Sequence, residues 1–248
     1  MNTLDMRGRT CPVLGDVNAR IRIIQPMDDH ELEALNDEIA LIAEYSGEAP
    51  FLLTAVPVRD WNAELSPWPA PTVFGREPFA GRADALLQDV IETLLPALSA
   101  RHPVEDPAYV IGGYSLAGLF ALYAAYRTGL FHGVAAVSPS LWYPDWSAFA
   151  DSRAIGADCA YLSLGDREER ARNPVMARVG DGVRAEYQRL KTALGNRAAL
   201  EWNPGNHFNE PERRTAKGLG WVVRRMNERE QAGGNGSHSS QSVSNTNL

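Results

Sequence analysis

The sequence predicts an α/β protein, with a mostly parallel sheet of about six strands and helices on both faces. Short apolar runs rich in β-branched residues alternate along the chain with longer segments whose apolar residues recur at helical spacing. The chain has 248 residues, of which 44% are hydrophobic, and this size and composition suit one such domain. We expect that domain to occupy residues 1–230.

The predicted elements follow one another as strand and helix from residue 21 onward. The strands are residues 21–24, 51–58, 109–111, 134–137, 161–164 and 199–202. The helices are residues 28–42, 83–98, 116–128, 183–194 and 215–226. A long loop rich in proline and tryptophan occupies residues 59–81. Residues 231–248 have almost no large apolar side chains, which predicts a disordered tail.

The composition excludes several classes of protein. The formal net charge of −7 argues against nucleic acid as a partner, because phosphate binding draws on clustered Lys and Arg. No apolar run is long enough to span a membrane, and residues 1–11 do not resemble a secretory signal, so we expect a cytoplasmic protein with no membrane partner. Cys11 and Cys159 form no Cys-x-x-Cys pair, and no His/Cys spacing suggests a metal, so neither a metal nor another cofactor is expected. A homodimer is compatible with all of these features.

Residues 113–118, GYSLAG, place Ser115 between small residues where a predicted strand turns into a predicted helix. A nucleophile on such a sharp turn needs small neighbours two positions away on each side, because larger side chains would clash. Ligands of parallel sheets also bind beyond the carboxyl ends of the strands, which is where this serine lies. Ser115 is therefore the candidate nucleophile.

A serine nucleophile needs a base, and His207 follows the last predicted strand. This position fits the chain order serine, acid, histidine that accompanies such a turn. The remaining histidines are placed less well: His30 lies at a helix start, His102 and His132 lie in loops that precede strands, and His238 lies in the predicted tail. An acid should orient the imidazole, and the segment after the fifth strand offers Asp166 and Glu168 as candidates. We interpret the third carboxylate there, Glu169, as a solvated surface charge.

Four motifs in this order resemble a known family: GGYSLAGLFAL at residues 112–122, SPSLW at 138–142, YLSLGD at 161–166 and GNHF at 205–208. From about residue 21 to residue 223 the chain resembles the predicted esterases of the α/β-hydrolase superfamily, which are related to enterochelin and other siderophore esterases and to esterase D. The resemblance favours Glu168 as the acid, because the acid of related hydrolases commonly stands three residues after the strand-end glycine, here Gly165. Asp166 is the alternative. The resemblance also implies that the first strands of the sheet are missing, because this chain is shorter before Ser115 than most relatives.

The residues around this triad have expected roles of their own. The backbone N–H of Leu116 should stabilise an oxyanion, with a second N–H from Met27, because Pro26 has none. Aromatic residues in the loops after strands are candidates for substrate contacts: Trp61, Trp142 and Tyr143. Arg59 would bind a substrate carboxylate or pair with Asp60.

These observations predict a serine hydrolase that cleaves a small-molecule carboxylic ester through Ser115, His207 and Glu168 and an acyl-enzyme intermediate. The same residues would serve a thioesterase or an acyltransferase. The alternative from another class is a non-catalytic binding protein that kept the fold.

Overall fold

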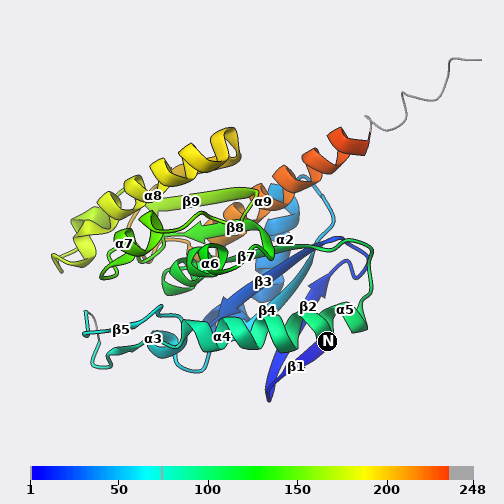
Figure 1. Ribbon diagram of the computed structural model, residues 1–248, viewed down its shortest axis with the longest axis horizontal. Coiled ribbons are helices and arrows are strands. Elements are labelled where there is room, and N and C mark those ends of the chain that lie inside the picture. The colour runs from blue at the N-terminus through cyan, green and yellow to red at the C-terminus, as the bar shows by residue number, and fades with distance from the viewer. Residues whose placement is uncertain (1, 74, 235–248) are drawn as a thin grey trace, which may run out of the picture.

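The computed structural model describes residues 2–73 and 75–234. Its centre is a mostly parallel sheet, which contains eight strands within these residues, in the order β1-β2-β4-β3-β7-β8-β9-β10 (Figure 1). The strands are β1 (Asn2–Met6), β2 (Arg9–Gly15), β3 (Ile21–Met27), β4 (Leu52–Pro57), β7 (Ala108–Tyr114), β8 (Phe131–Val137), β9 (Cys159–Gly165) and β10 (Ala198–Asn203). Strands β3, β4 and β7 to β10 run parallel, whereas β2 is antiparallel to both β1 and β4.

The six strands predicted from the sequence are confirmed, but the prediction that the first strands are missing is wrong. Strands β1 and β2 form a hairpin at the edge of the sheet. Each contributes only two well-buried side chains to the core: Leu4 and Met6 from β1, Cys11 and Val13 from β2. So few apolar residues, spread over two short strands, leave no apolar run to detect in the sequence.

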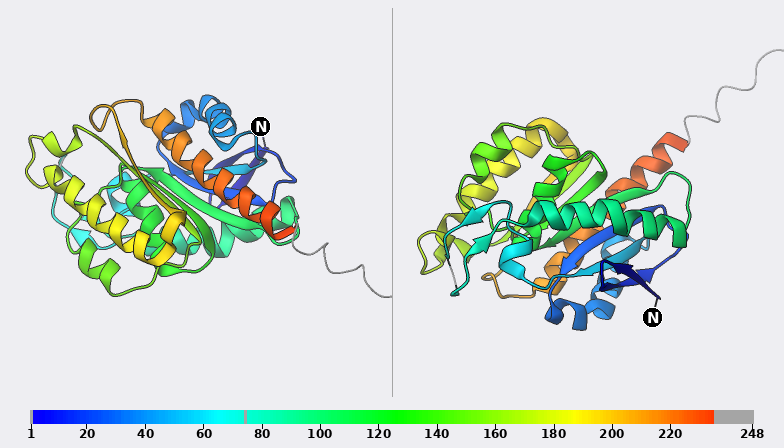
Figure 2. Two further views of the ribbon diagram at one scale, coloured as in Figure 1. Left: turned by 90° about the horizontal axis from the view of Figure 1, so that it is seen from above. Right: turned by 60° about the horizontal axis from the view of Figure 1, so that its bottom comes forward.

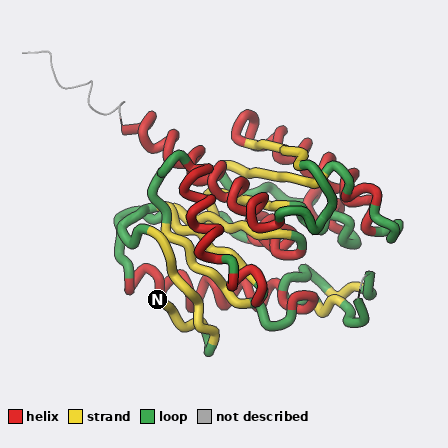
Figure 3. Tube along the Cα trace, turned by 180° about the vertical axis from the view of Figure 1, so that it is seen from behind, coloured by secondary structure: helices red, strands yellow, loops and turns green. Residues whose placement is uncertain are grey.

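Helices cover both faces of the sheet, as predicted (Figure 2). Each layer encloses its own hydrophobic cluster. One face carries α2 (Leu35–Ser46) and α9 (Pro211–Gly234), which pack on each other and appear in front of the strands when the protein is seen from behind (Figure 3). The other face carries α4 (Ala83–Asp89), η1 (Val90–Leu94), α5 (Leu95–Arg101), α6 (Leu116–Arg127), α7 (Trp146–Asp151) and α8 (Val179–Leu194). Segments α4, η1 and α5 follow one another without a break, with a π-helical turn in the middle.

Short elements fill the connections between strands and helices, most of them at the carboxyl ends of the strands. They are α1 (Asp29–Glu33), α3 (Trp61–Glu64), β5 (Pro69–Ala70), β6 (Phe79–Ala80), η2 (Glu168–Arg170), η3 (Met176–Arg178) and η4 (Gly195–Arg197), of which η4 alone lies at the opposite edge. Helix α9 extends to Gly234, so residues 231–234, expected in the tail, are helical. The rest of that expected tail, residues 235–248, lies outside the described residues. Among the described helices, none combines the length and the apolar character that a membrane span requires.

Candidate active site

Ser115 stands on a strained turn between β7 and α6, with φ 58° and ψ −119°. Residues other than glycine rarely adopt this conformation, and the surrounding structure has to hold it in place. A Cβ atom on Gly113 would lie 2.5 Å from the Cβ of Ala117, and one on Gly118 would lie 3.0 Å from the Gly113 carbonyl oxygen. The predicted need for small residues on both sides of Ser115 is confirmed, and Ala117 is tolerated because residue 113 is a glycine.

The structure joins Ser115, His207 and Glu168 in one hydrogen-bonded chain. His207 Nε2 lies 3.0 Å from Ser115 Oγ, and His207 Nδ1 lies 2.7 Å from Glu168 Oε2. The Glu168 side chain is 4% exposed and that of His207 is 25% exposed. Because the buried carboxylate can only accept, it favours the tautomer that carries its proton on Nδ1 and leaves Nε2 free to accept the Ser115 proton.

The second oxygen of Glu168 is held by three donors. Glu168 Oε1 accepts from Ser138 Oγ at 2.7 Å, from the Gly165 N–H at 2.8 Å and from Arg214 Nη2 at 2.8 Å. Burial alone would raise the pKa of this carboxyl, but its hydrogen bonds with His207, Arg214 and Ser138 outweigh burial and hold the pKa below its usual value. Glu168 is therefore an ionised acceptor for the imidazole at neutral pH.

Asp166, the alternative acid, shapes the turn. Its Oδ1 accepts from the Gly205 N–H at 2.8 Å, and its side chain is 55% exposed. The Arg167 N–H donates to the Gly205 carbonyl at 3.0 Å, so the loop after β9 is hydrogen-bonded to the loop that carries His207. A Cβ on Gly165 would lie 2.5 Å from that same Gly205 oxygen, which explains the strand-end glycine. Of the two candidates, only Glu168 contacts the imidazole.

Leu116 is well placed for the first oxyanion donor, because it is the first residue of α6 and its N–H has no acceptor within the helix. The positive end of the helix dipole also lies at this point. Any negative charge that develops beside Ser115 Oγ would therefore be stabilised by this N–H and by the helix.

Met27 does not suit the role of second donor, which corrects the prediction. It is the last residue of β3, fully buried, paired with Pro57, and its carbonyl accepts from the Val58 N–H at 2.8 Å. Because Pro57 has no N–H, the parallel pairing at this position uses the N–H of Met27. The next N–H along the chain, that of Asp28, donates to the Glu31 carboxylate at 3.0 Å in a capping box. The sequence predicted that this strand ends at residue 24, but it continues for three more residues. Met27 is therefore part of the sheet and not of the loop after it.

Two of the four predicted substrate contacts are placed elsewhere. Exposed Arg59 donates from Nη2 to the Gly8 carbonyl at 2.6 Å, so it fastens the β1–β2 turn and does not pair with Asp60. Tyr143 is 3% exposed and its hydroxyl donates to the Trp68 carbonyl at 2.5 Å, so it belongs to the core. The other two, Trp61 and Trp142, are half-buried and pack against the hydrophobic core from the loops beyond β4 and β8. The contacts of Arg59 and Tyr143 could not be predicted from local sequence, because both depend on packing between segments that are far apart in the chain.

Two further tryptophans differ in their burial. Trp202 is 37% exposed, and the Arg184 guanidinium lies 4.8 Å from its ring centroid. Trp221 is half-buried beside Tyr161, with ring centroids 5.8 Å apart. Position on a regular strand is thus a poor guide to burial when that strand lies at the edge of the sheet, as β10 does.

Four residues of this site were not identified from the sequence: Tyr114, Ser138, Phe208 and Arg214. The Tyr114 hydroxyl donates to the His207 carbonyl at 2.7 Å. Phe208 is 84% exposed, and its ring lies edge-on to His207 with centroids 5.5 Å apart. Tyr114, Ser138 and Phe208 stand inside or beside the four motifs, which was the available signal, whereas nothing in the sequence around Arg214 marks it.

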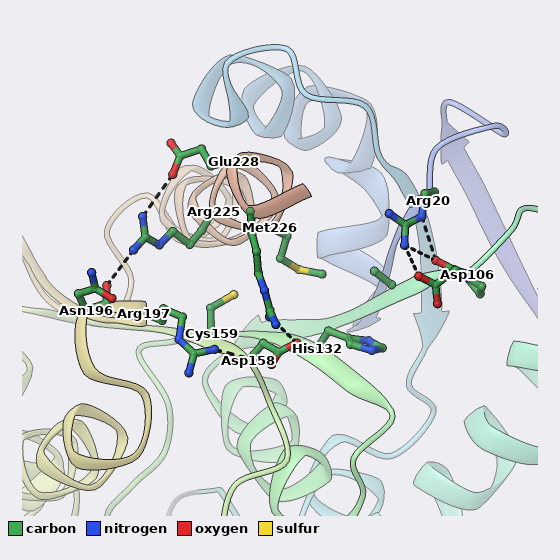
Figure 4. Close-up of a pocket in the computed structure, with 13 residues that line it drawn as sticks. Arg20, Asp106, His132, Asp158, Cys159, Asn196, Arg197, Arg225, Met226 and Glu228 are labelled. Atoms are coloured by element: carbon green, nitrogen blue, oxygen red, sulfur yellow. Dashed lines mark hydrogen bonds and ion pairs between the residues drawn. The ribbon is translucent and has the colours of Figure 1, made fainter. Parts of the chain in front are cut away.

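A separate cavity of about 530 Å³ lies at the opposite edge of the sheet, where β7, β8 and β9 begin (Figure 4). Ion pairs line it, among them Arg20–Asp106 at 2.6 Å and Arg229–Asp158 at 2.9 Å. Cys159 faces this cavity, but burial raises the pKa of its thiol to about 12, so it is no thiolate nucleophile at neutral pH. The hydrogen-bonded Ser115 and His207 thus make the carboxyl-end site the better candidate for ester chemistry.

The sheet order, the strained serine turn and the histidine after the last strand define the α/β-hydrolase fold. A family model described as "Putative esterase" matches residues 40–198, and the chain belongs to this family of hydrolases that act on esters. The match includes Ser115 and Glu168 and ends before His207.

Solved structures with this fold include siderophore hydrolases. The siderophore hydrolase EstA from Aspergillus nidulans is 17% identical with a TM-score of 0.70, over 88% of this chain and 90% of that one. An IroE-like serine hydrolase from Shewanella oneidensis is 16% identical with a TM-score of 0.69, over 89% of this chain and 76% of that one. The enterobactin esterase FES from Shigella flexneri is 20% identical with a TM-score of 0.64, over 88% of this chain and 56% of that one. These likenesses establish the fold.

Proposed function

We propose that this protein is a serine esterase that hydrolyses carboxylic esters through an acyl-enzyme on Ser115. The observation that carries the proposal is the continuous chain from Ser115 Oγ through His207 to Glu168, with distances of 3.0 and 2.7 Å. In this geometry one ring nitrogen accepts the nucleophile's proton while the other is held by a carboxylate. No metal or other cofactor takes part in the proposed reaction.

The proposed reaction has two half-reactions. Ser115 Oγ attacks the ester carbonyl carbon while His207 Nε2 takes its proton, and the oxyanion receives the N–H of Leu116. The tetrahedral intermediate collapses, the bond to the alkoxy oxygen breaks, and His207 returns the proton to the leaving alcohol. Water then attacks the acyl-enzyme with His207 again as base, which releases the acid and restores Ser115.

A fluorophosphonate probe tests the nucleophile directly. We expect one probe molecule to add to wild-type protein, with the mass increase on the peptide that contains Ser115. Hydrolysis of an ester panel that includes short-chain, aromatic and siderophore esters should be lost in the labelled protein. A protein that neither takes up the probe nor hydrolyses any ester in the panel would point to the non-catalytic alternative.

Phe208 gives a prediction about substrate choice. A large aromatic side chain that is 84% exposed beside the proposed base can cover an apolar part of a bound ester. We expect Phe208→Ala to raise KM for esters with a large apolar or aromatic group about fivefold, which is about 1 kcal/mol. The value of kcat for a short-chain ester should stay unchanged.

The matched control for this prediction is Leu130→Ala, which removes an apolar side chain that is 39% exposed just before β8, at the other edge of the sheet. This control should leave KM unchanged for every ester. Equal KM values for Phe208→Ala and wild type across the panel would show that the substrate does not reach Phe208.

A further inference from the structure

Arg214 is the most deeply buried charged partner of the proposed triad. It lies in the first turn of α9, and its side chain is 4% exposed. Its Nη2 donates to Glu168 Oε1 at 2.8 Å and also to Ser138 Oγ. A guanidinium that has left water to this degree needs such acceptors, since an unpaired buried charge is very unfavourable.

The other terminal nitrogen of the same guanidinium, Nη1, contacts the loop that carries the proposed base. Arg214 Nη1 donates to the Asn206 carbonyl at 3.2 Å and lies 3.4 Å from the Asn209 carbonyl. These two residues flank His207 in the chain. One rigid, planar group thus contacts both the acid and the backbone on either side of the histidine.

The ring of Tyr114 packs against the Arg214 guanidinium. The Arg214 guanidinium carbon lies 5.4 Å from the centroid of the Tyr114 ring, and the Tyr114 hydroxyl donates to the His207 carbonyl at 2.7 Å. Tyr114 directly precedes Ser115. The segments that carry the nucleophile, the acid and the base therefore all meet at Arg214. Among the described residues, the hydrogen bonds of the imidazole go to Ser115 and Glu168 and not to Arg214.

We propose that Arg214 is a positioning residue, which holds Glu168 and the His207 loop in the relative position that lets the imidazole face Ser115. This inference rests on the proposed esterase function and deepens it. Arg214 acts through Glu168 and the loop backbone and does not contact the reacting atoms. Its role in orienting the triad predicts an effect on kcat, and its charge predicts an effect on the pH dependence of activity.

The pH effect follows from the charges around Glu168. The charged or titratable groups that face Glu168 are Arg214 on α9, His207 in the loop after β10 and Tyr114 on β7. The charge of Glu212, also on α9, acts on the Tyr114 hydroxyl. Burial raises the pKa of Tyr114 to about 12, so its hydroxyl stays neutral near pH 7. The pKa of Glu168 is lowered, and its ionised form, which accepts from His207, is lost as the pH falls through that value. Removing the nearby cation would raise the pKa of Glu168, which moves the acid limb of kcat/KM to higher pH.

The test compares Arg214→Met with wild type and with Arg22→Met on an ester that wild type hydrolyses. Arg22 is a matched control, because it is 1% exposed and its Nη2 also donates to two carbonyls, of Val17 at 3.0 Å and His102 at 3.2 Å, at the opposite edge of the sheet. Arg214→Met should lower kcat about 100-fold at matched folded fraction, with little change in KM, and shift the acid limb up by about one pH unit. Arg22→Met should lower the melting temperature and leave kcat and the pH profile of the folded protein as in wild type.

Arg214→Lys separates charge from geometry. A lysine keeps the cation but cannot contact Glu168 and the His207 loop as one planar fork. We expect its acid limb to return toward that of wild type while kcat remains reduced. If Arg214→Met does not fold, Arg214→Lys carries the test by itself, and a wild-type kcat in this variant would overturn the positioning role.

Two outcomes separate failure of this inference from failure of the proposed function. If wild-type protein takes up the fluorophosphonate on Ser115 and hydrolyses esters, and Arg214→Met does so with the kcat and pH profile of wild type, the inference alone is wrong. If wild-type protein shows neither labelling nor hydrolysis, the proposed function fails and the role of Arg214 fails with it.

Discussion

Replacing Ser115 with alanine is expected to lower kcat for ester hydrolysis by a factor on the order of 10⁴ or more, as for nucleophiles of other triads. The substitution removes one oxygen atom that lies 3.0 Å from His207 Nε2. The strained backbone at residue 115 would remain, because it is set by the surrounding turn and the Gly113–Ala117 contact. The measurement is steady-state hydrolysis, together with the loss of fluorophosphonate labelling.

The melting temperature serves as the control for this variant. Removing the hydroxyl takes away the long contact with Ser140 Oγ at 3.5 Å and the bond to His207, so only a small change in stability is expected. A folded Ser115→Ala protein that kept more than about a tenth of wild-type activity, a barrier change of only about 1.4 kcal/mol, would contradict the proposed mechanism.

The substitution Glu168→Gln is expected to lower kcat by orders of magnitude with little effect on KM. A glutamine amide cannot carry the charge that stabilises the imidazolium. Its N–H₂ group would also face hydrogen-bond donors in place of the carboxylate oxygen that accepts from them. Glu168 accepts from His207, Ser138, Gly165 and Arg214. The change should therefore also lower the free energy of unfolding, by about 1–3 kcal/mol, so activities have to be compared at matched folded fraction.

Asp166→Asn is the matched comparison for this prediction. The asparagine oxygen can still accept the Gly205 N–H, which the aspartate receives at 2.8 Å, and the side chain is 55% exposed. We expect kcat to stay within a few fold of wild type and the melting temperature to change little. A larger loss of kcat for Asp166→Asn than for Glu168→Gln would reverse the assignment of the acid, and no loss for either would indicate a Ser–His dyad.

The sequence by itself determined the class of fold and pointed to the candidate nucleophile and the candidate base. Six strands and the helices between them follow from apolar periodicity, which depends on residues within a few positions of one another. Ser115 was found because a strand-to-helix turn with small neighbours is a local requirement, and a Cβ at Gly113 would indeed lie 2.5 Å from Ala117. His207 was found from chain order, because the loops after parallel strands all meet at one edge of the sheet.

Only the tertiary structure shows which carboxylate contacts His207 and which other residues support the candidate site. Asp166 and Glu168 are two residues apart, and the choice depends on side-chain direction after β9, which turns Glu168 toward His207 and Asp166 toward Gly205. Arg214 lies 46 residues beyond Glu168 in the chain, and no local pattern encodes their 2.8 Å contact. Such contacts arise when α9 packs on the sheet, because they depend on the distance and direction between elements that are far apart in the chain.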